Sequence, residues 1–170
     1  IAPSLVGSEM CIRDSSHAAG LADVEQAKPF AEDTLVRIFS MTKPITSVAA
    51  MMLYEQGCFQ LDDPVAKYLP EFAQTPVWKG GAHALNEVEA QASPMLVKHL
   101  FTHTSGLTYG FMNTNVVDAQ YRAMGLEFPG KPDNLAQWVE QLASVPLICQ
   151  PGSQWNYSVA TDVLGRLVEV

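Results

Sequence analysis

A serine and a lysine three positions apart, Ser40 and Lys43, form the pair in this sequence whose spacing best suits nucleophilic catalysis. A serine hydroxyl is a weak nucleophile until a neighbouring group removes its proton. Residues three apart on a helix lie on one face, so the Lys43 amine could reach the Ser40 hydroxyl. The amine must be neutral to act as a base, and both burial and the positive end of a helix dipole lower the pKa of a lysine. The amide of Ser40 could also stabilise an oxyanion.

The S-x-x-K pattern alone is weakly specific, and the alternative is that Ser40 caps a helix whose first turn exposes Lys43. A lysine opposes the dipole at that end of a helix, which favours the functional interpretation. Tyr157 is the third candidate, at the start of the last expected helix. A nearby cation would lower the pKa of this tyrosine and suit it to relay a proton between serine and leaving group. The alternative role of Tyr157 is packing as a hydrophobic staple.

Other polar clusters are weaker candidates. Three histidines raise the question of a metal site, but no carboxylate stands at ligand spacing from them. They are His83, His99 and His103. The adjacent acids Asp62 and Asp63 precede a proline and are expected in a turn rather than as a catalytic pair. We therefore predict no metal and no cofactor.

Two strands and a helix are expected to position the serine. Residues 16–23 and 34–39 predict short strands. Apolar side chains then recur at helical spacing between Pro44, which fits a first turn, and Gly57, a natural stop. These side chains are Ile45, Val48, Ala49, Met52 and Leu53. The pattern predicts that a strand runs into a buried helix near Ser40.

Three more helices are expected, over residues 94–101, 133–144 and 158–170, with Asp133 as a candidate N-cap of the second. The last two have apolar faces that we expect to be buried: Leu135, Trp138, Val139 and Leu142 in one, and Val163, Leu164, Leu167 and Val168 in the other. Further large side chains are expected in the core rather than in a ligand site: Met51, Met52 and Trp155. Residues 61–72 are expected to form a loop.

Composition excludes several classes of protein. The 170 residues suit one domain or a piece of a larger one. Eighteen acidic and ten basic residues give a net charge of −8, and the basic residues are scattered, which argues against nucleic acid as a partner. No apolar run is long enough to span a membrane. The three cysteines, Cys11, Cys58 and Cys149, have no disulfide or zinc spacing and are expected to be small buried hydrophobes.

The two ends of the chain look unlike the rest. Residues 1–15 show no periodicity, and we interpret them as a non-native leader similar to a translated sequencing adapter of metagenomic reading frames, or else as a disordered terminus. The last helix reaches Val170 without a capping residue, and two early strands have no later strands to pair with. Residues 16–170 are therefore expected to be the N-terminal part of one domain whose later strands are missing.

Three blocks of sequence together carry a resemblance to a known family. They are FSMTKPITSVAAMMLYEQGCFQLDDPVAKYLPEF, LVKHLFTHTSGL and PGSQWNYSVATDVLGRLVEV, in that order, and they span about residues 39–170. They resemble the serine β-lactamase and penicillin-binding-protein superfamily, specifically the class C-like branch that includes the family VIII carboxylesterases. Each block alone is weak, whereas the joint match is highly specific.

The resemblance implies an α+β fold in which an α/β sandwich subdomain joins a mostly helical one, with the active site in the cleft between them. It implies that Ser40 is the acylated nucleophile, that Lys43 activates it and that Tyr157 is the general base of the Y-x-N element. His103 would fall in a structural H-T-S-G turn. The full-length parent would be a metal-independent bacterial serine hydrolase of small-molecule esters or β-lactams, in the cytoplasm or the periplasm.

Two departures from the family pattern affect the substrate. Val159 stands where the third residue of Y-x-N is typically an asparagine that helps to bind the acylamino group of a lactam or peptide, and valine has no such donor. This favours carboxylester hydrolysis, with β-lactamase or D-Ala-D-Ala carboxypeptidase activity and a non-catalytic binding protein as alternatives. The strand that bears K-T-G and completes the oxyanion hole is absent, so the fragment is expected to be inactive.

Overall fold

The computed structural model describes residues 16–126 and 134–170 and divides the chain into two compact units, residues 1–39 and 40–170. In the first unit, strand β1 (Leu21–Asp23) pairs antiparallel with β2 (Lys28–Pro29). The expected strand at residues 16–23 is thus confirmed only at its end. The strand expected at residues 34–39 is wrong: these residues lie outside both sheets, and a 3-10 helix, η3 (Phe39–Met41), begins at their end. A β-branched run becomes a strand only where a neighbour accepts its backbone hydrogen bonds.

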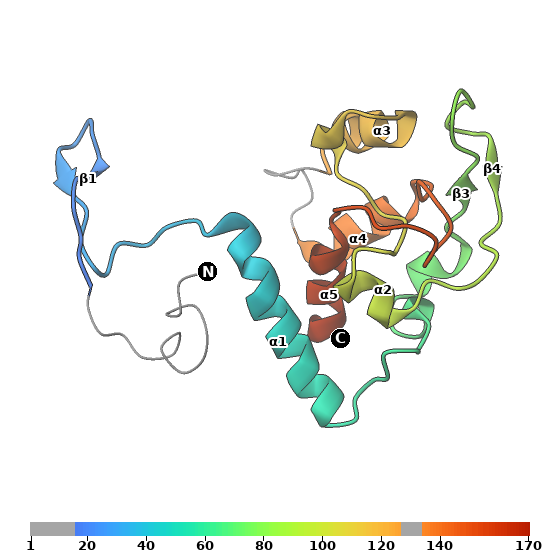
Figure 1. The fold of residues 1–170 in the computed structure, drawn as a ribbon, viewed down its shortest axis with the longest axis horizontal. Helices are drawn as coiled ribbons and strands as arrows, with labels where there is room; N and C mark the ends of the chain where they lie inside the picture. The colour runs from blue at the N-terminus through green and yellow to red at the C-terminus, as the bar shows by residue number, and fades with distance from the viewer. Residues whose placement is uncertain (1–15, 127–133) are drawn as a thin grey trace. The chain divides into compact units, whose positions relative to one another are not determined.

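The second unit is mostly helical (Figure 1). Its α-helices are α1 (Thr42–Glu55), α2 (Val97–Phe101), α3 (Val116–Met124), α4 (Leu135–Ala143) and α5 (Ala160–Glu169). Its 3-10 helices are η4 (Val65–Lys67), η5 (Pro70–Gln74) and η6 (Gly110–Met112). A short antiparallel pair joins β3 (Val77–Trp78) to β4 (Val88–Glu89), and Val77 also bridges Leu147. The helices expected from periodicity are therefore present.

Local signals account for where several helices begin and end. The Asn115 side chain accepts hydrogen bonds from the first amides of α3, and Gly125 ends that helix with a left-handed φ of 67°. Asn134 caps α4 in the same way, while the predicted N-cap, Asp133, lies outside the described residues. Gly57 follows α1 with a φ of 77°, as expected of a glycine stop.

Helix α5 forms the centre of the second unit, where it packs against α1, α2 and α4 (Figure 1). The residues predicted to be buried in α4 and α5 line this contact, with Leu135 and Val168 at its edge. The buried ones are Trp138, Val139, Leu142, Val163, Leu164 and Leu167. Burial of such side chains stabilises the fold by about 1.5–3 kcal/mol each. This core holds the start of α1 close to the start of α5.

The prediction for the apolar face of α1 is wrong. Within residues 40–170, Ile45, Val48 and Met52 are exposed, and the helix instead buries Ala50, with Leu53 at the edge of the core. Helix α1 is apolar on two sides, so periodicity alone could not tell which side meets α5. The side that faces α5 also carries Lys43, which directs the lysine toward the middle of the unit.

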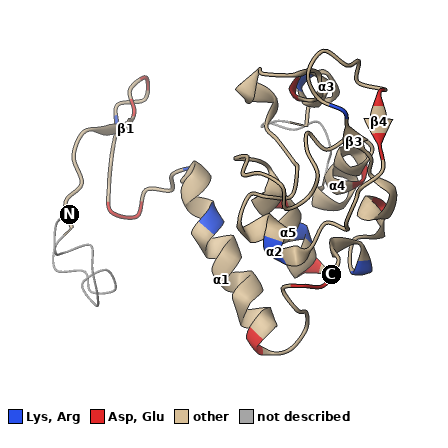
Figure 2. Ribbon diagram, turned by 45° about the vertical axis from the view of Figure 1, so that its right-hand side comes forward, with Lys and Arg blue, Asp and Glu red and all other residues tan. Residues whose placement is uncertain are grey.

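Charged residues are spread over several elements, and the described lysines and arginines form no continuous patch (Figure 2). Among the described residues, no helix combines the length and the apolar character that crossing a membrane requires.

Candidate active site

The candidate nucleophile lies just before α1, in the short helix η3. Ser40 is exposed, and the residue at the N-cap of α1 is Met41, whose side chain makes no capping hydrogen bond. The alternative in which Ser40 caps the helix is therefore wrong. The preceding residue, Phe39, has a φ of 46°, a conformation that costs a bulky L-residue energy.

The structure brings the three predicted site residues together, from the two ends of the second unit. The hydroxyl oxygens of Ser40 and Tyr157 are 2.6 Å apart. The Lys43 amine donates to the Ser40 hydroxyl at 3.4 Å and lies 4.7 Å from the centre of the Tyr157 ring. Since Lys43 occupies a lone pair of the Ser40 oxygen, the serine proton is free to point at the Tyr157 oxygen. This arrangement prepares a proton transfer from Ser40 to Tyr157.

The surroundings shift the pKa values of Lys43 and Tyr157 in opposite directions. Contact with Lys43, followed by the hydrogen bond from Ser40, lowers the pKa of Tyr157 from its ordinary value. Burial tends to lower the pKa of Lys43, but the oxygens of Tyr157 and Tyr109 together outweigh burial and raise it. The expectation that burial would leave this amine neutral is thus wrong. The pair favours a charged Lys43 and makes Tyr157 the better proton acceptor.

A second tyrosine, Tyr109, was not among the predicted site residues. Its hydroxyl accepts a hydrogen bond from Lys43 at 3.2 Å, and its ring centre lies 5.4 Å from that of Tyr157. Burial raises the pKa of Tyr109, so it remains a neutral phenol beside the lysine. It orients the amine between two oxygens. The available signal in the sequence was its position three residues after the H-T-S-G turn.

The H-T-S-G turn sets the position of Tyr157. His103 adopts a left-handed φ of 55°, and its carbonyl accepts from the amide of Asn156 at 2.8 Å. The amide of Ser158 donates to Nδ1 of the His103 ring at 3.3 Å, and the ring packs 4.9 Å from the Tyr157 ring. Burial and the charge of Lys43 lower the pKa of His103, consistent with a neutral ring that accepts at Nδ1. His103 therefore holds Tyr157 from two sides.

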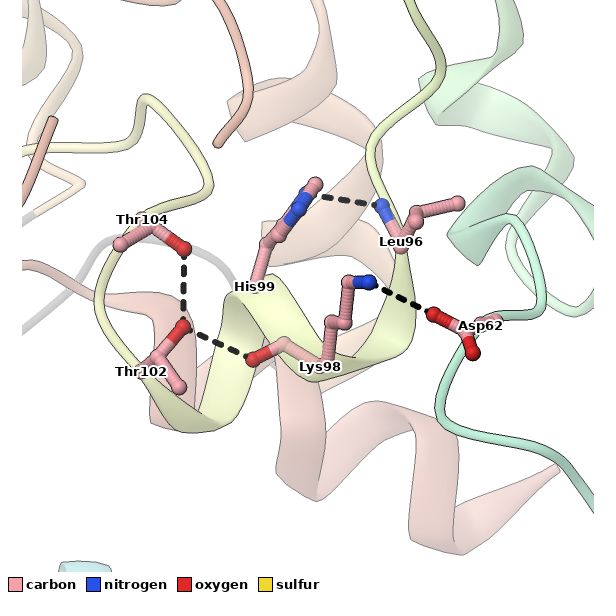
Figure 3. A network of polar contacts seen from close by, with 6 residues as sticks. All are labelled: Asp62, Leu96, Lys98, His99, Thr102 and Thr104. Carbon is pink, nitrogen blue, oxygen red and sulfur yellow. Dashed lines mark hydrogen bonds and ion pairs between the residues drawn. The ribbon is translucent and has the colours of Figure 1, made fainter. Parts of the chain in front are cut away.

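Polar contacts on α2 hold this turn in place (Figure 3). Lys98 pairs with Asp62 at 2.6 Å, and the Thr102 hydroxyl donates to the Lys98 carbonyl at 2.9 Å and meets the Thr104 hydroxyl at 2.8 Å. The His99 ring lies over the same helix and accepts the Leu96 amide at 3.1 Å. The Thr104 carbonyl in turn accepts from Gly152 at 2.7 Å. These hydrogen bonds, which run from α2 through Thr104 to Gly152, thus fix the segment that leads into Tyr157.

A buried carboxylate, that of Asp118, stabilises the segment that carries Tyr109. Asp118 is fully buried and accepts hydrogen bonds at 2.8 Å from the Thr108 hydroxyl and from both the amide and the hydroxyl of Thr114. These bonds satisfy the charge and tie α3 to the residue before Tyr109.

We expect Gly106→Ala to destabilise the fold by about 2–4 kcal/mol. Gly106 has a φ of 84°, and a Cβ at this position would lie 2.4 Å from the Cys149 carbonyl oxygen. The matched control is Gly57→Ala, because Gly57 has a φ of 77° and no atom within 4 Å of the added Cβ. The control isolates the backbone strain, about 1–2 kcal/mol. Urea denaturation measures both variants, and equal losses would show that the close approach to Cys149 carries no cost.

The remaining candidates from the sequence have structural roles. Within the described residues no group of three histidine, cysteine or acidic side chains could hold a metal ion. Asp63 lies in a turn as expected, where hydrogen bonds from Tyr68, Gln60 and Lys67 lower its pKa to about 2. His83 meets Glu87 at 3.0 Å.

The expectations for cysteines and large side chains are partly wrong. Cys149 is buried as predicted, Cys58 is exposed, and Cys11 lies outside the described residues; Cys58 and Cys149 are free thiols. Trp138 is in the core as predicted, whereas Trp155 is 66% exposed beside Tyr157. Trp155 is thus the second residue near the site whose place the sequence did not reveal.

Comparison with known proteins identifies the family of this chain. A family model described as Beta-lactamase matches residues 13–170. The chain is 40% identical to Protein Rv1367c of Mycobacterium tuberculosis over 149 residues, which is 88% of this chain and 36% of that protein. It is 40% identical to Esterase EstB of Burkholderia gladioli over 154 residues, which is 89% of this chain and 36% of that esterase. It thus spans just over a third of the length of these relatives.

A solved structure gives the same result for the fold. The structure titled "EstCE1, a hydrolase with promiscuous acyltransferase activity" superposes with a TM-score of 0.71 at 34% identity, covering 90% of this chain and 37% of that one.

Proposed function

This chain belongs to the beta-lactamase family, and we propose that the protein that contains it is a serine hydrolase that forms an acyl-enzyme on Ser40. The described residues form part of that family's α+β fold. The observation that carries the proposal is the 2.6 Å approach of the Ser40 and Tyr157 hydroxyls with Lys43 bonded to the same serine oxygen. Residues 16–170 are proposed as the N-terminal part of the hydrolase domain. The activity is that of the whole protein, because the chain spans only 36% of EstB.

In the first half of the reaction Tyr157, as a phenolate, takes the proton of Ser40 while the ammonium of Lys43 balances the charge. The serine oxygen attacks the ester carbonyl carbon, and the carbonyl oxygen becomes an oxyanion that the Ser40 amide helps to stabilise. The carbon–oxygen bond to the alcohol breaks, and Tyr157 gives its proton to the departing alcohol. The products of this half are the free alcohol and an acylated Ser40.

In the second half water takes the place of the alcohol. Tyr157 removes a proton from the water, the hydroxide oxygen attacks the acyl carbon, and the proton returns to the Ser40 oxygen as the acid leaves. An alcohol acceptor in place of water would give acyl transfer. The description of EstCE1 as a hydrolase with promiscuous acyltransferase activity favours this as a second candidate function.

We favour carboxylesters over lactams as substrates. Val159 is buried at the start of α5, with 3% of its surface exposed, so it offers a substrate neither a hydrogen-bond donor nor contact area. A lactam or peptide would need another residue to bind its acylamino group. EstB, named as an esterase, and EstCE1, named as a hydrolase, support the same choice. β-Lactamase, D-Ala-D-Ala carboxypeptidase and non-catalytic binding remain the alternatives that the experiment separates.

The test compares three probes on the full-length protein. We expect turnover of p-nitrophenyl butyrate, covalent labelling by a fluorophosphonate, and little turnover of a fluorescent penicillin. Hydrolysis of the penicillin without ester turnover would reject the esterase in favour of the β-lactamase, and lasting covalent labelling by the penicillin without ester turnover would favour the D-Ala-D-Ala carboxypeptidase. A protein that no probe modifies, yet binds its ligand, would be the non-catalytic alternative. A denatured sample provides the background for each probe.

A further inference from the structure

Four aromatic side chains form a continuous strip beside the candidate nucleophile, in the order Trp155, Tyr157, Tyr109 and Phe111. The ring centres are 6.5 Å apart from Trp155 to Tyr157, 5.4 Å from Tyr157 to Tyr109, and 4.7 Å from Tyr109 to Phe111. The two end pairs are nearly parallel, with interplanar angles of 28° and 23°. Only the two central residues are needed for the proton transfer proposed above.

The ends of the aromatic strip are open to solvent. Trp155 is 66% exposed and Phe111 is 61% exposed within the second unit, whereas Trp78 and Trp138 are at most 9% exposed. Exposed large aromatic surface is unfavourable in water, by roughly 25 cal/mol for each Å² that burial would remove. An exposed ring at each end of a strip that meets the candidate nucleophile is typical of a surface that a ligand covers.

The strip is held in place before any ligand binds. The residue between Trp155 and Tyr157, Asn156, bonds through its amide to the His103 carbonyl and through its side chain to the Leu107 carbonyl, both at 2.8 Å. The Trp155 ring meets the His103 ring edge-on, with centres 6.3 Å apart. At the other end, Phe111 lies in η6, whose Gly110 carbonyl accepts from Arg122. A rigid aromatic surface loses little entropy when a ligand binds to it.

The charges around the strip favour a neutral ligand. Lys43 is held by the oxygens of Ser40 and Tyr109. The carboxylate of Asp162, in the first turn of α5, acts on both Tyr109 and Tyr157 and would repel an anionic group there. Burial and the charge of Lys43 lower the pKa of His103, which favours the neutral form of its ring. At the Phe111 end of the strip, Arg122 donates to the Gly110 carbonyl.

We propose that the aromatic strip is a substrate subsite that selects esters with a neutral, flat apolar group, and that Trp155 and Phe111 are its specificity-determining residues. The inference rests on the proposed acyl-enzyme function. A phenyl group attached one or two carbons from the carbonyl would stack on either end while the carbonyl carbon stays at the Ser40 oxygen. Offset stacking of this kind contributes about 0.5–1.5 kcal/mol beyond area burial.

The test uses two boronic acids as inhibitors of the full-length protein, phenethylboronic acid and butylboronic acid. Each adds to Ser40 by forming an oxygen–boron bond, with the serine proton passing to Tyr157, so both report the nucleophile equally. Only the first carries a ring. We expect phenethylboronic acid to inhibit ester turnover at a concentration about 3–10-fold lower, and Trp155→Ala or Phe111→Ala to remove part of this advantage without changing inhibition by butylboronic acid.

The conservative variants Trp155→Phe and Phe111→Tyr retain a ring and should restore the preference, which a purely structural role would not predict. Equal inhibition by the two boronic acids, or equal weakening of both in Trp155→Ala and Phe111→Ala, would overturn the subsite. Failure of both boronic acids to inhibit the wild-type protein would instead overturn the acyl-enzyme function itself, and the subsite with it. The two failures are therefore distinguishable.

Discussion

Replacing Ser40 by alanine in the full-length protein is expected to lower kcat/KM for p-nitrophenyl butyrate by at least about 10³-fold. The variant removes the atom that would carry the acyl group, and no described side chain offers a replacement: the oxygen 2.6 Å away belongs to Tyr157, which the mechanism uses as a base. The fold should be unaffected, because Ser40 is exposed and does not cap α1.

A labelling measurement and a control variant accompany the Ser40→Ala rate. Intact-mass spectrometry should find one fluorophosphonate adduct on the wild type and none on the variant. Ser144→Ala is the matched control, since Ser144 is exposed at the end of α4 and its hydroxyl donates only to the nearby Gln141 carbonyl at 2.7 Å. Residual activity within tenfold of the wild type, or an adduct that persists in the variant, would show that another residue is the nucleophile.

The sequence predicted the parts of the fold that follow from local pattern. The helices of the second unit that carry a strong apolar period, α4 and α5, have the predicted faces in the core because each has one apolar side. Helix α1 exists where predicted, but it is apolar on two sides, and only packing against α5 decides which one is buried. The strand expected at residues 34–39 failed for a similar reason, since pairing is not a local property.

For the candidate site, too, the residues in local sequence blocks could be predicted, whereas contacts between distant parts of the chain could not. Ser40, Lys43 and Tyr157 could be predicted as a group because each belongs to a recognisable block, and the described structure brings their side chains together. The protonation of Lys43 could not be predicted, because it depends on two phenol oxygens that arrive from different parts of the chain. Tyr109 and Trp155 were missed or misplaced since their roles follow only from which rings they meet in space.

Removing only the hydroxyl of the second proposed catalytic residue, in Tyr157→Phe, is expected to lower kcat/KM by about 10²–10⁴-fold. The ring would keep its contacts with His103, Tyr109 and Trp155, so the loss isolates the oxygen that meets Ser40. Tyr54→Phe is the matched control: Tyr54 packs on Phe59 with ring centres 5.9 Å apart, on the other end of α1. Thermal denaturation should give similar midpoints for all three proteins.

The pH dependence of kcat/KM tests whether Tyr157 acts as a base or only as a hydrogen-bonding neighbour of Ser40. The proposed base is the phenolate, whose fraction increases with pH, so kcat/KM of the wild type should rise as Tyr157 ionises. Because contact with Lys43 lowers the pKa of Tyr157, this rise should occur below the ordinary tyrosine pKa of 10.0; the raised pKa of Lys43 keeps the amine charged throughout the rise. Tyr157→Phe should lack this rise, while Tyr54→Phe should retain it. A Tyr157→Phe variant that keeps both the rate and the rise would assign the proton transfer to Lys43 instead.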